Sequence, residues 1–310
     1  MHKGSSRATT IVIAQSKGGA GKTTLAAHLG VAFAELFHAV MLIDTDHQGS
    51  LARWHQQRDA REACDAARLG FVATTGWQLP GEILRRARDN AILVVDTPPR
   101  ADAEVRTVIK CADLVVVPVQ PSPVDVWATL STLEIAQSEQ VPVLLVLNRV
   151  PARAALTAAM RQELACYDVG LASTSISNRV ALAAAFTEGW GITEFAHGSP
   201  AELEMVALAA ELWDLLPSWL REPECDAEVM PPRADCVPYA SREERECEGV
   251  GAADSVVESK NASEVLELIE PATLTDYSRD NLTGHSALLT REKLLSGIAF
   301  LKRRLTQNRR

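Results

Sequence analysis

Three short segments of the sequence carry residues suited to binding a nucleotide and a metal ion. The first reads Ser16-Lys17-Gly18-Gly19-Ala20-Gly21-Lys22-Thr23-Thr24, and it lies between an apolar run and a stretch with helical spacing. A glycine-rich turn between a strand and a helix presents backbone N–H groups and the positive helix end to an anion, and a lysine adds a point charge. The segment therefore predicts a phosphate-binding loop, in which Lys22 contacts the β- and γ-phosphates.

The other two segments end apolar runs with carboxylates. Asp44 and Asp46 follow the run 40–43, and Asp96 follows the run 92–95. In open parallel sheets ligands bind at the carboxyl ends of the strands, which is where all three segments end. An aspartate at the end of such a strand holds Mg²⁺ in nucleotide hydrolases, together with the hydroxyl of the phosphate loop. We expect Thr23 and Asp96 to supply these oxygen ligands.

The phosphate loop departs from the usual spacing G-x-x-x-x-G-K-[ST] at one position. Ser16 stands where the first glycine belongs, and a second lysine, Lys17, precedes the glycines. Two further motifs accompany the loop, Asp-x-Asp-x-Gln-Gly-Ser at 44–50 and Asp-Thr-Pro-Pro at 96–99. Together the three motifs resemble those of the ParA/MinD family of deviant Walker A ATPases, and the resemblance covers residues 9–216. The segments 117–123 and 147–150 also match this family, and the short N-terminus is typical of its small ParA type.

The resemblance implies a role for each matching residue. Lys17 corresponds to the signature lysine, which reaches the phosphates of the partner subunit in a nucleotide-sandwich dimer. Asp46 corresponds to the carboxylate that orients the attacking water, and Asp44 would lie near the magnesium ion. Asn148, with Arg149, lies where the family recognises adenine. The remaining nucleotide-binding positions are Gly18, Gly19, Ala20, Gly21, Lys22, Thr23 and Thr24. His47 departs from the family, which usually has proline there.

The resemblance also implies a function. We expect a slow, Mg²⁺-dependent ATPase that forms a homodimer on binding ATP, binds nonspecific DNA, and is released by a ParB-like or other small activator protein. Partition of a plasmid or chromosome is the main hypothesis. The alternatives are positioning of another cargo such as a chemotaxis cluster or a carboxysome, a MinD-like membrane ATPase, and a nucleotide-gated DNA scaffold. Candidate DNA contacts are Arg153, Arg161, Arg179 and Arg221.

The elements that position these residues follow from hydrophobic patterning. Apolar strand-like runs alternate with amphipathic stretches, which favours βαβ units, and several runs are apolar throughout, as in strands buried on both faces. We therefore expect an α/β fold with a mostly parallel twisted sheet and helices on both faces. The expected strands are 10–15, 39–44, 69–74, 91–96, 113–119, 142–148 and 169–174. The expected helices are 22–37, 50–66, 79–89, 101–111, 122–140, 152–165, 178–187 and 200–216.

Composition divides the chain into four parts. Residues 1–8 are predicted to be a flexible N-terminus, 9–221 the ATPase domain, 222–284 an acidic and disordered linker, and 285–310 a basic amphipathic helix. Residues 291–310 hold seven basic and one acidic side chain. Such a helix docks on a partner, an anionic membrane or DNA, or packs on its own protein or dimer mate. The evenly spaced Cys225, Cys236 and Cys247 fit no metal-binding spacing.

Charge and hydropathy limit the function classes. The 310 residues carry a formal net charge of −9, so any contact with DNA must come from local patches. The sequence contains neither an apolar run long enough to span a bilayer nor the apolar core of a signal peptide. We expect a cytoplasmic, nucleoid-associated protein for which membrane binding is not expected.

Overall fold

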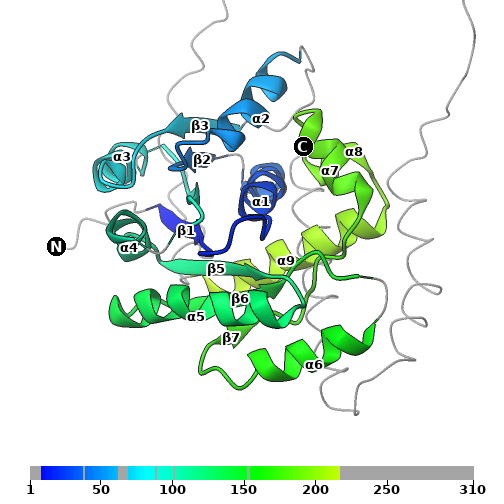
Figure 1. Cartoon of the computed structure of the whole chain (residues 1–310). Helices are drawn as coiled ribbons and strands as arrows, with labels where there is room; N and C mark the ends of the chain where they lie inside the picture. Colours follow the sequence, from blue (N-terminus) through cyan, green and yellow to red (C-terminus); the bar gives the residue numbers. More distant parts are fainter. Residues whose placement is uncertain are drawn as a thin grey trace, which may run out of the picture. The chain divides into compact units, whose positions relative to one another are not determined.

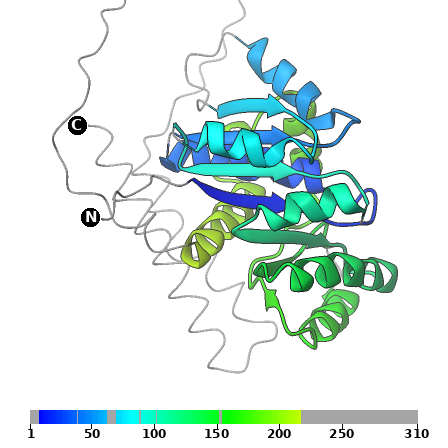
Figure 2. The same cartoon turned by 90° about the vertical axis from the view of Figure 1, so that its left-hand side faces the viewer.

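The computed structural model describes residues 8–37, 39–61, 69–87, 89–100, 102–151 and 154–216. These residues form a sheet covered by helices on both faces, as the sequence predicts (Figure 1 and Figure 2). Residues 1–7 of the predicted N-terminal segment 1–8, the linker 222–284 and the basic segment 285–310 lie outside the described residues, and Ala8 is buried next to β1. In the part that is described, no helix is both long and apolar enough to cross a membrane.

The sheet has seven strands in the order β3-β2-β4-β1-β5-β6-β7, and all neighbouring strands run parallel. The central strands are buried along their whole length, which explains why their sequences are apolar at nearly every position. The strands are β1 Thr9–Ile13, β2 Val40–Asp44, β3 Leu69–Ala73, β4 Ile92–Asp96, β5 Leu114–Val119, β6 Val143–Leu147 and β7 Gly170–Leu171.

Each face of the sheet packs against its own set of helices, with a separate hydrophobic core between. On one face lie α1 Lys22–Phe37, α2 Ser50–Asp59, α7 Val180–Thr187, α8 Ile192–Phe195 and α9 Pro200–Leu215. On the other face lie α3 Leu79–Arg86, α4 Ala103–Lys110, α5 Pro123–Ser138 and α6 Ala154–Leu164. Helix α1 directly follows the phosphate loop and packs over the central strands β1, β2 and β4 (Figure 1).

The register of the central strands aligns the chemically active residues. Asp96 of β4 pairs with Asp44 of β2 on one side and with Ile13 of β1 on the other. Since these residues stand in one row at the carboxyl edge, the two aspartates and the start of the phosphate loop are brought together by strand pairing alone.

Three elements differ from the sequence expectation. Strand β7 covers two residues instead of 169–174, because the N–H groups of Ser173 and Thr174 donate to the carboxylate of Glu211 in α9 rather than to β6. The short helix α8 was not expected. It begins where the Glu194 carboxylate accepts the N–H of Gly191 at 2.9 Å, and Ile192 is buried in the core. Helix α2 ends at Asp59, and residues 62–66 of the expected helix lie outside the described residues.

Candidate active site

The phosphate loop is shaped by two glycines with left-handed backbone. Gly19 has φ +79° and Gly21 has φ +91°. A Cβ on Gly21 would lie 2.6 Å from Nδ2 of Asn148, so this position has no space for a side chain. The loop is also held from the ends of β5 and β6, since Gln120 Nε2 donates to Gly19 O at 2.9 Å and Asn148 Nδ2 donates to Ala20 O at 2.8 Å.

Lys22 begins α1 and is buried beneath the loop. Burial lowers the pKa of its ammonium group, while the carboxylates of Asp96 and Asp46 oppose this change. The site therefore holds a desolvated positive charge between the loop and the strand ends, which is suited to an anionic ligand.

Asp96 is fully buried at the end of β4. Both of its carboxylate oxygens lack a hydrogen bond of good geometry among the described residues. Burial raises the pKa of Asp96 to about 7, although the nearby Thr23 hydroxyl and Lys22 ammonium oppose the shift. A buried carboxylate without partners is costly, so these oxygens are available to a ligand.

The other two carboxylates have different environments. Both oxygens of Asp44 accept backbone N–H groups at 3.0 Å, from Asp46 and Ala52, and the residue is buried. Asp44 therefore fixes the turn that leads into α2. Asp46 is partly exposed, and its Oδ1 accepts the N–H of Gln48 at 3.0 Å. Thr45 ties this turn to β4, because its N–H and hydroxyl both donate to Asp96 O, at 3.1 and 2.7 Å.

These groups fit a magnesium ion held jointly with a nucleotide. Asp96 and Thr23 offer hard oxygen ligands, which Mg²⁺ prefers, and the two Asp96 oxygens have no hydrogen bond of good geometry in the described part of the chain. In the described ranges no group of three or more His, Cys, Asp and Glu side chains is placed to hold a metal by itself. Such a sparse set is typical of Mg²⁺, which is usually bound through one or two carboxylates together with substrate phosphates and water.

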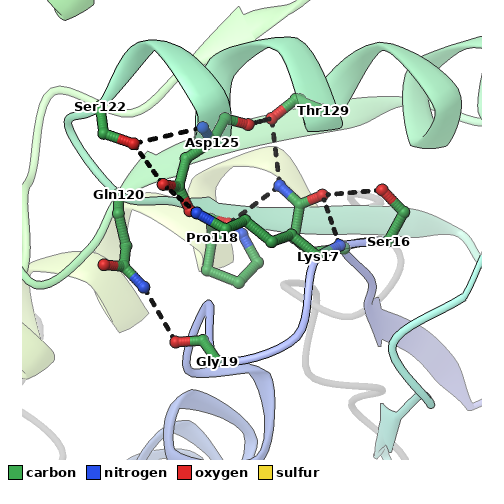
Figure 3. A network of polar contacts seen from close by, with 9 residues as sticks. Ser16, Lys17, Gly19, Pro118, Gln120, Ser122, Asp125 and Thr129 are labelled. Atoms are coloured by element: carbon green, nitrogen blue, oxygen red, sulfur yellow. Dashed lines mark hydrogen bonds and ion pairs between the residues drawn. The ribbon is translucent and has the colours of Figure 1, made fainter.

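Lys17 forms an ion pair within its own subunit. Its Nζ lies 2.6 Å from Oδ2 of Asp125 in the first turn of α5 (Figure 3). The Ser122 hydroxyl donates to the same oxygen. Asp125 is buried, and its Oδ1 has no hydrogen-bond partner among the described residues. The carboxylate is thus partly satisfied, and the only charge it pairs with in the described part is that of Lys17.

Gln15 fixes the path of the chain just before Lys17. Its Nε2 donates to the Thr129 hydroxyl at 3.0 Å and to Pro118 O at 3.3 Å, and its Oε1 accepts the Lys17 N–H at 3.4 Å. The Ser16 hydroxyl donates to Ala128 O at 2.7 Å. The leading edge of the loop is therefore attached to one side of α5.

The parts played by Asp125 and Gln15 were not predicted from the sequence. Ser122 and Asp125 have the spacing of a helix N-cap followed by an acidic residue in the first turn, and the Ser122 hydroxyl does accept the Asp125 N–H at 3.3 Å. That signal predicts the start of α5. It carries no information on a partner 108 residues away in the chain.

A pocket of about 100 Å³ opens beside Gly21, between α1, the end of β6 and α7. Asn148 and Arg149, the residues expected to recognise adenine, line it together with His28 and Arg179. Burial lowers the pKa of His28 to about 4, so its neutral ring joins Leu182 O to the Ile192 N–H. The pocket adjoins the phosphate loop, as a base-binding site requires, and adenine recognition stays a prediction.

The candidate DNA contacts that the structure describes are engaged within the subunit. Arg161 donates to Ala172 O at 2.9 Å and to the Ser175 hydroxyl at 2.6 Å. Arg179 pairs with Glu204 at 2.8 Å. Arg153 and Arg221 lie outside the described residues, and DNA contact by all four arginines stays a prediction.

His47, the residue that departs from the family pattern, is exposed after the Asp44–Asp46 turn. Its Nε2 lies 3.8 Å from Oε2 of Glu104 in α4. Glu104 also accepts the Gly76 N–H at 2.7 Å. His47 therefore borders the turns that follow β2 and β3, at the same edge of the sheet as the phosphate loop.

Comparison with known proteins agrees with this geometry. The model of the CobQ/CobB/MinD/ParA nucleotide binding domain matches residues 11–191, from β1 through the phosphate loop to the end of α7. The chain belongs to this family. The MinD/ParA resemblance predicted from the three sequence segments is thereby confirmed, and the family accounts for the nucleotide-binding character of the fold.

The chain is also similar to individual members of this family. The chain is 32% identical over 193 residues to maintenance of carboxysome distribution protein A of Halothiobacillus neapolitanus, covering 60% of this chain and 87% of that protein. It is 31% identical over 130 residues to protein ParA of Rhizobium radiobacter, covering 42% of this chain and 57% of that protein. The structure of the MinD cell division protein of Aquifex aeolicus has the same fold, with a TM-score of 0.56 at 20% identity over 67% of this chain and 97% of that one.

Proposed function

We propose that this MinD/ParA-type protein is a positioning ATPase in which ATP joins two subunits around a shared active site. The observation that carries the proposal is the fully buried Asp96 carboxylate, which has no hydrogen bond of good geometry among the described residues and lies beside the Thr23 hydroxyl and the buried Lys22 ammonium. Family membership supports a nucleotide as the ligand.

The proposed chemistry assigns one task to each group. Lys22 and the backbone N–H groups of the loop bind the phosphates, and Asp96 with Thr23 holds Mg²⁺, which neutralises charge on the phosphate oxygens. Asp46, the most exposed of the three carboxylates, orients the attacking water. Asp44 keeps Asp46 in place, since the Asp44 carboxylate accepts the Asp46 N–H at 3.0 Å.

Lys17 completes the proposed active site from the partner subunit. Within its own subunit Lys17 pairs with Asp125, so it must leave that carboxylate before it can reach a phosphate across a dimer. A lysine that approaches in this way supplies positive charge where negative charge develops in the transition state, as an arginine finger does.

The proposed cargo is inferred from the proteins to which the chain is similar. Similarity to a carboxysome distribution protein extends over 87% of that protein, whereas similarity to a ParA protein extends over 57% of it. We therefore favour a carboxysome-like protein assembly as cargo over the plasmid or chromosome that the sequence analysis put first. The proposal keeps two further partners. The ATP-bound dimer binds nonspecific DNA, and a small activator protein stimulates hydrolysis and thereby releases the dimer.

The catalytic part is tested by ATPase assays and light scattering on the purified full chain. We expect Mg²⁺-dependent hydrolysis and an ATP-dependent shift from monomer to dimer, and we expect Asp96→Asn to abolish hydrolysis. Lys17→Ala should still bind ATP but neither dimerise nor hydrolyse it. Lys110→Ala, which changes an exposed lysine of α4, is the matched control. An unchanged Lys17→Ala variant would refute the shared active site.

The cargo is tested in the native host by replacing the gene with the Asp96→Asn form. Carboxysome-like bodies, located by electron cryo-tomography, should cluster instead of spreading along the cell, while plasmids and chromosomes are retained normally. If plasmids are lost while the bodies stay normally spaced, or if the host has no such bodies, the carboxysome-like cargo is refuted and DNA partition becomes the favoured function.

A further inference from the structure

Helix α5 has an exposed apolar face beside the active site. Val124, Trp127 and Leu130 are 58%, 61% and 41% exposed, and their spacing puts them along one side of the helix. We call these three residues the α5 stripe. The opposite side of α5 is buried in the core and carries Val126 and Thr129. Adjacent large apolar side chains on a surface typically mark a binding site.

We propose that the α5 stripe is the docking surface for residues 286–305 of the same chain. This segment, outside the described residues, repeats apolar side chains at helical spacing, at Leu288, Leu289, Leu294, Leu295, Ile298, Leu301 and Leu305. An amphipathic segment of this kind buries its apolar side in an apolar groove or against an apolar helix face.

Charge favours the same pairing. The exposed side of helix α5 carries one acidic side chain, Glu134, and no basic one, since Asp125 is buried and already pairs with Lys17. Residues 291–310 carry seven basic side chains and one acidic side chain. Opposite charges around an apolar contact steer two surfaces together and reject like-charged competitors.

Chain length permits the contact. The described residues end at Leu216, and residues 217–285 can span up to roughly 230 Å when extended. Helix α5, with 16 residues, is about 24 Å long. A covalent tether also keeps the local concentration of the segment high, so a small stripe can retain it without strong intrinsic affinity.

The stripe lies on the helix that holds Lys17. Val124 directly precedes Asp125, and Trp127 directly precedes Ala128, whose carbonyl accepts the Ser16 hydroxyl. A segment docked on the stripe would stabilise the first two turns of α5 together with the Lys17–Asp125 ion pair. The docking itself does not depend on the proposed ATPase cycle. The idea that docking restrains Lys17 from reaching a partner subunit does rest on the proposed function.

The docking is tested by a photo-crosslinking amino acid at position 127 of the full chain, without nucleotide. We expect crosslinks to peptides from 286–305 in a product of monomer mass. They should disappear when Leu294→Asp and Leu301→Asp are combined in the same chain. The matched control has the crosslinker at Leu84, an apolar residue of α3 that is 76% exposed, and should give no crosslink to 286–305.

Other products would overturn the docking proposal. Crosslinked products of dimer mass would show that the stripe is an interface between two copies of the chain. Residues 286–305 would be excluded as the occupant if position 127 crosslinked to other peptides or to a co-purified protein. They would also be excluded if position 84 crosslinked to them as strongly as position 127. The restraint is tested separately, because the double variant in 286–305 should dimerise at several-fold lower ATP. If crosslinking succeeds and no ATP-dependent dimer forms in either protein, the docking stands and the proposed function fails.

Discussion

The buried carboxylate of Asp96 makes a quantitative prediction about pH. Burial raises its pKa from 3.8 to about 7 in the folded protein, whereas the unfolded chain titrates near the ordinary value. Between about pH 4 and pH 7 the folded protein keeps a proton that the unfolded chain has lost. The free energy of unfolding contributed by this group therefore falls as pH rises through that window. At 1.36 kcal/mol for each pH unit, the loss reaches ~4 kcal/mol above pH 7.

Replacing Asp96 with asparagine removes the titration while keeping the size of the side chain. Without Mg²⁺ and nucleotide, Asp96→Asn should match the wild type in stability near pH 4 and exceed it increasingly toward pH 8. The value of ~4 kcal/mol is an upper limit, because buried Lys22 loses an opposite charge in the variant. Hydrolysis, by contrast, should be lost at every pH, since the proposed metal ligand is gone.

Urea denaturation at several pH values between about 5 and 8, in the presence of EDTA, measures the difference. The control is Asp102→Asn, because Asp102 is exposed and caps α4 by accepting the Glu104 and Val105 N–H groups at 3.1 Å. Asparagine caps a helix equally well, so this variant should parallel the wild type. A stability gain in Asp96→Asn that stays the same at every pH would refute the reasoning.

Three other substitutions test the architecture around the site. Asp125→Asn removes the charge that holds Lys17, so dimerisation should occur at lower ATP in light scattering, and an unchanged or higher ATP requirement contradicts the restraint. Gly21→Ala places a Cβ against Asn148 in a residue of positive φ, so it should lower the free energy of unfolding by ~1–3 kcal/mol. It should also weaken nucleotide binding at least tenfold, as measured by calorimetry. Its control is Gly81→Ala, where the added Cβ meets open space and the free energy of unfolding should not fall. Arg58 of α2 forms a buried bidentate ion pair with Glu194 of α8, at 2.7 and 2.6 Å. Arg58→Ala removes the positive charge beside that buried carboxylate and should destabilise the domain by ~3–5 kcal/mol in urea denaturation, and a loss below 1 kcal/mol would be inconsistent with the burial of the pair.

The fold was predictable because its signals are local. The central strands are buried on both faces, so their sequences are apolar at nearly every position and stand out without any knowledge of their neighbours. The order of strand, glycine-rich loop and helix likewise lies within one short stretch of chain. The parallel sheet and the ParA/MinD family, both predicted from these patterns, are confirmed.

The environment of the site was less predictable because it depends on contacts between distant segments. Nothing near Lys17 in the sequence indicates Asp125, and nothing near Arg161 indicates the carbonyl groups that it binds after β7. The sequence also suggests similar metal-binding parts for Asp44 and Asp96. Only the fold distinguishes them, because the Asp44 oxygens accept two backbone N–H groups and the Asp96 oxygens accept none from the described residues.

The row formed by Ile13, Asp44 and Asp96 has a consequence for how the chain tolerates changes of length. Because side chains alternate between the faces of a strand, one residue inserted into β2 or β4 would turn its aspartate to the opposite face of the sheet. The turns at the other edge, such as residues 139–142 between α5 and β6, lie at the opposite ends of the strands and lack this constraint. Insertions and deletions among homologues should therefore gather in those turns, and a reporter domain inserted there should leave the catalytic edge intact.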